Sequence, residues 1–227
     1  CGIPYAIGGE IADFEELTPR DAKWFKKRYN VDIHTSHEVL CINHSTKIVT
    51  VKNLLTGDVF EDKYDVLVFA TGATFLTPDA FLGKHFENVF QVRNINSGKK
   101  IKSFIENEKP MTAVIVGAGY IGLEVAEQLK ARGIEVTILQ RGKHPLSHLD
   151  WDMSIRIEDE MIKQGIDFRS EETIQTLNGS SRLDEAITNK GTKLSADMYI
   201  LATGVQPNVS LAQSIGVKLG ETGAIAT

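Results

Sequence analysis

Apolar residues form two kinds of extended run along this chain. Short runs rich in β-branched and aromatic residues are typical of strands in a small sheet, and they occur at 31–34, 38–43, 47–54 and 58–60. The residues at 53–58 have the composition of a hairpin turn. Longer continuous apolar runs indicate strands that are buried on both faces, and they lie at 65–72, 112–116, 135–140 and 198–204.

Between these runs, apolar residues recur at helical spacing. Segments with this spacing lie at 18–29, 94–107, 119–132 and 150–165. In the first of them we expect Thr18 to cap the helix and Pro19 to occupy its first position. Short apolar runs predict a further small sheet inserted before the last buried strand, and they lie at 166–170, 171–177, 183–189 and 192–197. This alternation of strands and helices predicts an α/β fold.

Two of the expected strand ends resemble each other. The sequence Leu-Val-Phe-Ala-Thr-Gly ends at Gly72, and Tyr-Ile-Leu-Ala-Thr-Gly ends at Gly204. This similarity predicts two related units within the 227 residues, with a boundary near Lys109, where the hydrophobic pattern changes.

The overall composition is that of an ordinary globular protein. Hydrophobic residues make up 42% and charged residues 24%, with a formal net charge of −5. Because no basic run accompanies this negative charge, we expect neither nucleic acid nor an anionic membrane surface as a partner. No apolar run has the roughly 20 residues that a membrane-spanning helix needs. Two cysteines, Cys1 and Cys41, do not make a disulfide framework, so we expect a cytoplasmic protein.

The segment 114–129 carries the strongest chemical signal. After an apolar strand, Gly117, Gly119 and Gly122 have the spacing Gly-x-Gly-x-x-Gly and open a helix. In a dinucleotide site the first glycine permits a tight turn, the second lets the backbone approach the pyrophosphate, and the third lets helix and strand pack closely. Unpaired N–H groups at the helix N-terminus then hold the phosphates. Because a strand is also predicted after the helix, the sequence indicates a Rossmann-like dinucleotide site.

The end of that next strand bears on which dinucleotide binds. NAD sites usually carry an Asp or Glu there, which accepts hydrogen bonds from the ribose hydroxyls. This chain has Gln140 instead, followed by Arg141 and Lys143. Since a guanidinium pairs with the 2′-phosphate that a carboxylate would repel, we expect NADPH, or both NADPH and NADH. The alternative is that Arg141 lies in an ordinary solvated turn.

The first residues, Cys-Gly-Ile-Pro-Tyr, are not typical of a protein core, and a thiolate in such a loop can act as a nucleophile. This segment is followed by LVFATGA, VFQVRNI, VIVGAGYIGLEVAEQL and ILATGVQPN. In order and spacing these motifs resemble the flavin-dependent pyridine nucleotide–disulfide oxidoreductases over essentially the whole chain. The cysteine motif resembles the single-cysteine branch, which includes coenzyme A-disulfide reductase, NADH oxidase and polysulfide-reducing relatives.

This resemblance implies a domain organisation. It assigns 110–227 to a Rossmann-like NAD(P)-binding domain whose last residues return toward the FAD domain, and 1–109 to part of a related FAD-binding domain. The N-terminal Gly-rich unit, the second FAD motif and the C-terminal dimerisation domain of the family have no counterpart in the 227 residues. We therefore expect a fragment of a parent enzyme that forms a homodimer, and we expect the fragment itself to be inactive.

The resemblance also implies a reaction. NAD(P)H gives a hydride to the flavin, and the reduced flavin then reduces a disulfide between the redox cysteine and a substrate thiol. Cys1 matches the redox cysteine, whereas Cys41 has no counterpart and is interpreted as a packing residue. The substrate implied is a small-molecule disulfide, coenzyme A disulfide or polysulfide.

Individual site residues follow from the same match. The positions assigned to NAD(P) are Gly117, Gly119, Tyr120, Ile121, Gly122, Glu124, Gln140, Arg141, His148 and Gly204. The positions assigned to FAD are Val39, Ala70, Thr71, Gly72, Ala73 and Arg93. Arg28 and Tyr29 lie where coenzyme A-reducing relatives place a cation against the coenzyme A phosphates, although a tyrosine departs from that pattern. For Glu124 the alternative is an ordinary charge on a helix surface. No metal ligand is assigned.

Two other functions remain open. A sibling enzyme would use the same cysteine and flavin to reduce O2 or peroxide. A third possibility is a nucleotide-binding or redox-sensing module without turnover, for which the colour and spectrum of the full-length protein would discriminate.

Overall fold

The structure is a computed structural model and describes residues 2–226. These residues form two compact units: the first joins the chain up to Leu17 with Phe75–Gly204, and the second joins Thr18–Thr74 with the chain from Val205 onward. The expected boundary near Lys109 does not separate these units, because the segment 75–108 packs with the strands that follow it. The assignment of 1–109 and 110–227 to different cofactors stays a prediction.

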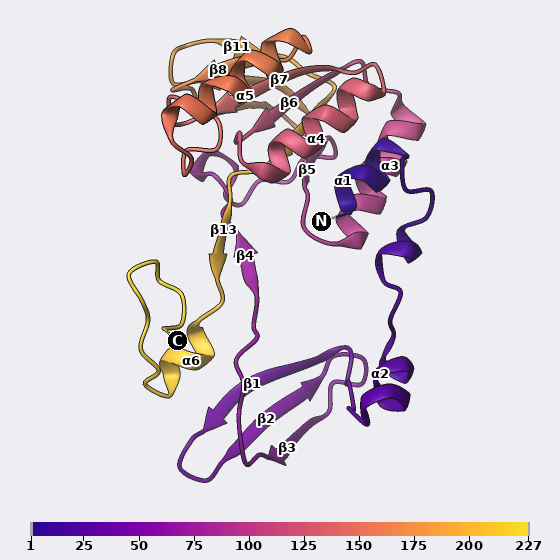
Figure 1. The fold of residues 1–227 in the computed structure, drawn as a ribbon, viewed down its shortest axis with the longest axis vertical. Coiled ribbons are helices and arrows are strands. Elements are labelled where there is room, and N and C mark those ends of the chain that lie inside the picture. The colour runs from indigo at the N-terminus through magenta and orange to yellow at the C-terminus, as the bar shows by residue number, and fades with distance from the viewer. Residues whose placement is uncertain (1, 227) are drawn as a thin grey trace. The chain divides into compact units, whose positions relative to one another are not determined.

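The first unit is built on a five-stranded parallel sheet (Figure 1). Across the sheet its strands are β5 (Val89–Gln91), β12 (Met198–Leu201), β6 (Thr112–Val116), β7 (Glu135–Gln140) and β8 (Asp167–Ser170). The predicted strands at 112–116 and 135–140 are confirmed and lie parallel. Strand β8 was expected in the inserted sheet, and this expectation is wrong. A helix before it returns the chain to the edge of the parallel sheet, where β8 pairs with β7.

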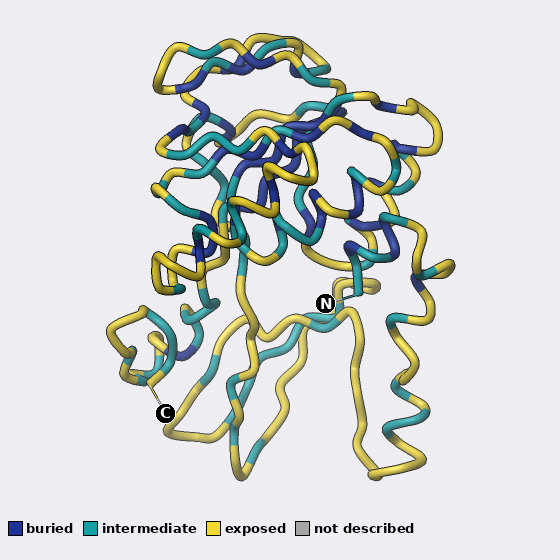
Figure 2. The backbone as a smooth tube through the Cα atoms, turned by 45° about the horizontal axis from the view of Figure 1, so that its top comes forward, coloured by how far each residue is buried: buried dark blue, intermediate teal, exposed yellow. Residues whose placement is uncertain are grey.

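Helices cover one face of this sheet. They are α1 (Ile3–Gly8), α3 (Ile95–Glu108), α4 (Tyr120–Ala131) and α5 (Trp151–Lys163). The same unit has two 3-10 turns: Phe14–Leu17, whose Phe14 packs with these helices, and Asp79–Phe81, whose Phe81 packs on the opposite face. Ala113 and Ile115 of β6 point to the helices, because side chains alternate along a strand. The dark blue, buried backbone in Figure 2 is concentrated in these layers.

A small antiparallel sheet covers the other face. It consists of β11 (Lys193–Leu194), β10 (Leu183–Thr188) and β9 (Ile174–Gly179), in that order. Val114 and Val116 of β6 pack against its apolar residues, together with the fully buried Tyr199 of β12. The parallel strands are therefore buried on both faces, which explains their continuous apolar sequence.

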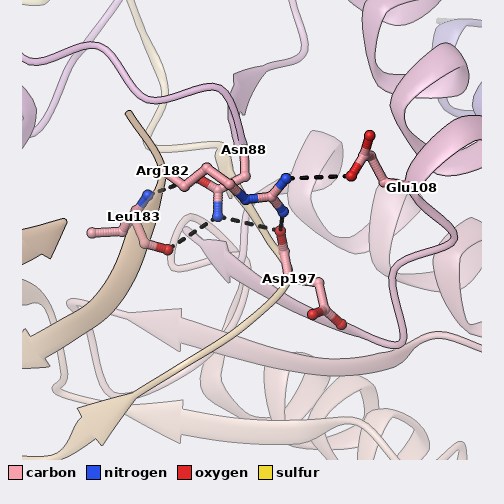
Figure 3. Close-up of polar contacts among 5 residues, drawn as sticks. All are labelled: Asn88, Glu108, Arg182, Leu183 and Asp197. Carbon is pink, nitrogen blue, oxygen red and sulfur yellow. Dashed lines mark hydrogen bonds and ion pairs between the residues drawn. The ribbon is translucent and has the colours of Figure 1, made fainter. Parts of the chain in front are cut away.

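A cluster of polar residues lies at the amino end of the sheet, where β5, β6 and β12 begin. Figure 3 shows this amino-end cluster, which consists of Asn88, Glu108, Arg182, Leu183 and Asp197. The buried Asn88 side chain donates to the carbonyl oxygens of Leu183 (3.0 Å) and Asp197 (3.2 Å) and accepts from the Leu183 N–H (2.8 Å). Arg182 pairs with Glu108 at 3.4 Å. A carboxylate oxygen of Asp197 accepts from the N–H groups that start β6, at 2.8 and 2.9 Å.

The second unit contains a three-stranded antiparallel sheet. It consists of β1 (His37–Asn43), β2 (Ile48–Asn53) and β3 (Val59–Lys63), and the predicted turn joins β2 to β3. The other elements are α2 (Ala22–Tyr29), β4 (Ala73–Phe75, whose last residue belongs to the first unit), β13 (Val205–Pro207) and α6 (Ser210–Ser214). Strands β4 and β13 pair with each other.

Three sequence predictions fail in this unit. Helix α2 begins after Asp21 rather than at Pro19, because the Asp21 carboxylate accepts from the Trp24 N–H at 2.8 Å and caps it there. The segment 31–34 forms no strand. The segment 65–72 is not a buried strand either: Val66 is 82% exposed, because none of the described strands pairs with these residues.

None of the helices in residues 2–226 combines the length and the apolar composition required to cross a membrane.

Candidate dinucleotide site

The glycine loop begins where β6 ends. The Gly117 N–H donates to the carbonyl oxygen of Leu139 in β7 at 2.7 Å, and Gly117 has a φ of 111°. A Cβ atom at this position would lie 2.3 Å from the carbonyl oxygen of Ala202. Both the positive φ and this close approach restrict the position to glycine.

The other two glycines differ in what surrounds them. A Cβ at Gly122 would lie 2.0 Å from the carbonyl oxygen of Gly117, so only glycine lets α4 start this close to the strand end. A Cβ at Gly119 would meet no described protein atom within 4 Å. Gly119 therefore borders open space, which is the geometry needed for a phosphate to approach the backbone.

No side chain caps the N-terminus of α4, which is also true of α1, α5 and α6. Gly119 is its N-cap residue and provides no side chain, whereas Asn94 and Ser97 form a capping box on α3. The first N–H groups of an α-helix have no intrahelical acceptor. In the 12-residue α4 they remain available for an anion, and the helix dipole adds to the attraction. The residues present therefore fit a dinucleotide pyrophosphate.

Gln140 at the end of β7 points back toward the glycine loop. Its Oε1 accepts from the Ala118 N–H at 3.0 Å, and its Nε2 donates to the carbonyl oxygen of His144 at 3.4 Å. Arg141 is exposed, and no carboxylate among residues 2–226 pairs with it or with Lys143. The Gln140 side chain thus stabilises the glycine loop, and the charges of Arg141 and Lys143 near it remain available to a ligand.

A buried carboxylate supports the same edge. The N–H of Glu172, which follows β8, donates to the carbonyl oxygen of Gln140 at 3.0 Å. Burial opposes ionisation of the Glu172 carboxyl, but hydrogen bonds from Thr188 and Thr192 and the positive charges of Arg169 and Lys190 together lower its pKa. The donor from Thr188 lies 2.6 Å from the carboxylate. Glu172 therefore holds the end of β7 through its backbone N–H and Thr188 through its buried carboxylate, a role that its sequence position did not reveal.

Tyr120 and His148 meet at the start of α4. The Tyr120 hydroxyl lies 2.8 Å from His148 Nε2, and the two rings are 5.0 Å apart. Both residues are exposed. Ile121 and Glu124 are half-buried on the same helix, and Gly204 follows β12, which neighbours β6. All ten residues expected at the NAD(P) site thus belong to the first unit.

The positions expected to contact FAD are divided between the units. Val39 of β1 and the exposed segment Ala70–Ala73 belong to the second unit, and the exposed Arg93 belongs to the first. Sequence reasoning missed Asn208, which is hydrogen-bonded to the Ala70–Ala73 segment. The motif ILATGVQPN ends at this residue, so the signal was present.

The remaining predicted residues lie at three places. Arg28 and Tyr29 end α2, where the guanidinium lies 5.9 Å from the centre of the tyrosine ring and Tyr29 is 59% exposed. Cys1 lies outside the described residues. Cys41 was expected to be a packing residue, but it is exposed on β1 with its Sγ 3.2 Å from the Thr50 hydroxyl. The outer strand of a small three-stranded sheet leaves such a side chain uncovered.

Comparisons with known proteins place this fold and loop in a family. The pyridine nucleotide-disulphide oxidoreductase family matches residues 1–227, and the chain belongs to it. A NADH oxidase of Methanocaldococcus jannaschii is 36% identical over 223 residues, which cover 97% of this chain and 49% of that protein. A coenzyme A disulfide reductase of Staphylococcus epidermidis is 35% identical over 225 residues, which cover 99% of this chain and 50% of that protein.

A solved structure agrees with this assignment. The NAD-dependent persulfide reductase from A. fulgidus superimposes with a TM-score of 0.90 at 32% identity, over 99% of this chain and 42% of that chain. The chain therefore spans about half the length of the curated relatives that it matches.

Proposed function

We propose that this chain supplies the NAD(P)H-binding part and some of the flavin contacts of a reductase that acts on a disulfide, coenzyme A disulfide or polysulfide. The observation that carries the proposal is the uncapped start of α4 beside Gly119, where the backbone borders open space. A pyrophosphate satisfies the free N–H groups there and is favoured by the helix dipole. The family supplies the reaction type, and the named relatives supply the classes of acceptor.

The free cations beside Gln140 favour NADPH, or acceptance of both cofactors. Arg141 and Lys143 have no carboxylate partner in the described part of the chain, so their charges remain available to a 2′-phosphate. Gln140 adds no negative charge to oppose it. Tyr120, Ile121, Glu124, His148 and Gly204 would line the rest of the bound dinucleotide.

Val39, Ala70–Ala73 and Arg93 would hold the flavin in this proposal. When bound, a flavin accepts two electrons from NAD(P)H and delivers them to a disulfide. Residues Ala70–Ala73 fit the role of flavin contacts because they are exposed, so a flavin can approach them. The only Gly-x-Gly-x-x-Gly in the chain is the one at 117–122, so the flavin pyrophosphate has no second loop of that kind here. We therefore expect residues 1–227 alone to retain FAD poorly.

Cys1 would be the redox nucleophile. Its thiolate attacks a substrate disulfide, forms a mixed disulfide and releases one thiol. Arg28 and Tyr29 would contact a coenzyme A substrate, the cation pairing with phosphate. Since this chemistry cycles a thiol, we place the enzyme in the reducing cytoplasm. The family resemblance further implies that the enzyme forms a homodimer.

A second candidate is reduction of O2 or peroxide by the same cysteine and flavin. It is supported by the similarity to a NADH oxidase, which is as high as the similarity to the coenzyme A disulfide reductase. Turnover with O2 and with coenzyme A disulfide, measured side by side, distinguishes the two candidates.

The test uses Cys1→Ser in protein made from the complete reading frame that encodes this chain. Serine cannot support sulfur exchange, so disulfide turnover should be lost while flavin reduction by NADPH continues at nearly the wild-type rate. Stopped-flow absorbance measures the first half-reaction, and steady-state thiol release measures the second. Retention of both activities would place the nucleophile elsewhere, and loss of both would mean that Cys1 shapes the flavin site instead of reacting.

A further inference from the structure

Asn208 of the second unit directs all four of its polar groups at one short segment. Its N–H donates to the carbonyl oxygen of Gly72 at 2.9 Å, and its Nδ2 donates to the carbonyl oxygen of Thr71 at 2.9 Å. Its Oδ1 accepts from the Thr74 hydroxyl at 2.7 Å. Its carbonyl oxygen accepts from the Thr71 hydroxyl. Four hydrogen bonds thus join Asn208 to Thr71, Gly72 and Thr74, which lie more than 130 positions earlier in the chain.

The part of this segment that precedes β4 has little other restraint. Residues Ala70–Ala73 are exposed, and 65–72 belong to none of the described strands. An irregular exposed backbone keeps most of its conformational freedom, so fixing it requires specific hydrogen bonds. Those that Asn208 makes fall on Thr71 and Gly72, inside the stretch assigned to the flavin.

We propose that Asn208 is a positioning residue that holds the backbone of Thr71–Ala73 in the conformation that receives the flavin. This inference rests on the proposed function, because it takes the bound group from there. Asn208 itself need not touch the flavin. It acts by pre-ordering the loop, so that binding loses less conformational entropy.

The chemistry of the side chain makes the proposal specific to asparagine. An amide donates and accepts at once, which the Thr71 carbonyl and the Thr74 hydroxyl require together. Aspartate has nearly the same shape and keeps the acceptor, but it presents an oxygen to the Thr71 carbonyl. If the side chain only filled space, Asn208→Asp would leave FAD binding unchanged. If it positions the loop through both hydrogen bonds, Asn208→Asp should weaken FAD binding.

The test compares wild type with Asn208→Ala, Asn208→Asp and Thr74→Val in protein made from the complete reading frame. FAD affinity is measured by fluorescence quenching on the flavin-free protein, and amide hydrogen exchange is followed at 71–74 without flavin. Asn208→Ala and Asn208→Asp should each weaken FAD binding by about tenfold, and Thr74→Val, which loses one bond, by about threefold. Exchange at 71–74 should accelerate in the same order.

The matched control is Gln206→Ala, an exposed residue of β13, the strand just before Asn208, which should change neither readout. FAD binding and exchange like wild type in Asn208→Asp would overturn the inference alone. If wild type binds no FAD, the proposed function fails and the inference fails with it. Should Asn208→Ala not fold, Asn208→Asp and Thr74→Val decide the question.

Discussion

The two ends of the parallel sheet differ in whether side chains satisfy the hydrogen bonds of the nearby backbone. At the amino end, Asn88 satisfies three backbone groups and Asp197 satisfies the first N–H groups of β6. At the carboxyl end, α4 starts without a side-chain cap and Gly119 borders open space. Unmet hydrogen-bonding groups are costly unless water or a ligand satisfies them. We therefore expect the amino end to contribute mainly to stability and the carboxyl end to binding.

The largest effect should come from Gly122→Ala at the carboxyl end. Its new Cβ would lie 2.0 Å from the Gly117 carbonyl oxygen, so the loop and α4 must separate. We expect NADPH affinity to fall by more than about 100-fold, since the N–H groups no longer converge on the pyrophosphate. Isothermal titration with NADPH measures the loss.

Gly119→Ala is the matched variant for that prediction. Its Cβ meets no described atom within 4 Å, so stability should be nearly unchanged while NADPH binding still weakens. Equal NADPH affinity in wild type and both variants would mean that the dinucleotide does not lie on this loop.

Asn88→Ala should produce the next largest effect, and at the opposite end. Removing the amide leaves the Leu183 N–H and carbonyl groups without their partner in a buried site. We expect unfolding free energy to fall by about 2–4 kcal/mol, with NADPH affinity unchanged in the folded protein. Urea unfolding measures the first quantity. A variant that binds NADPH more weakly at full stability would contradict the separation of the two ends.

A smaller change is expected when Gln140→Glu and Arg141→Ala are combined. Glutamate can keep the hydrogen bond from the Ala118 N–H with one oxygen while the other becomes available to the ribose hydroxyls. The preference should move toward NADH by about 1–3 kcal/mol, because a charge-assisted contact to the 2′-phosphate is lost. Titrating both cofactors against wild type and double mutant gives the ratio. An unchanged ratio would mean that Arg141 points to solvent.

The smallest expected effect is a pH dependence at the amino end. Partial burial opposes ionisation of Asp197, but hydrogen bonds from Met111 and Thr112 outweigh it and hold its pKa below the ordinary value of 3.8. A carboxyl whose pKa is lower in the folded state stabilises the protein above the unfolded pKa, and this contribution is lost as the pH falls through 3.8 and below it. Asp197→Asn should flatten that part of the stability profile. Equal slopes in wild type and variant below pH 4, measured by urea unfolding, would assign the acid sensitivity to other groups.

The sequence by itself determined the elements whose pattern is locally complete. The Gly-x-Gly-x-x-Gly loop, the strands that flank it and the helix 119–132 were predicted within a residue or two, because glycine spacing and continuous apolar runs have few structural solutions. The family also followed from motifs in their order, and the match over residues 1–227 confirms it.

Only the tertiary structure decided where each element finds its partners. The similar motifs that end at Gly72 and Gly204 predicted two buried strands, yet the second forms β12 in a complete sheet while Val68 of the first is exposed. Strand β8, which was expected in the small inserted sheet, instead pairs with β7 at the edge of the parallel sheet. Gln140 is expected beside a ribose, and the structure adds a contact that the sequence did not reveal: its amide oxygen accepts from the Ala118 N–H of the loop. Apolar pattern sets what a segment can bury, whereas burial itself depends on neighbours that come from distant parts of the chain.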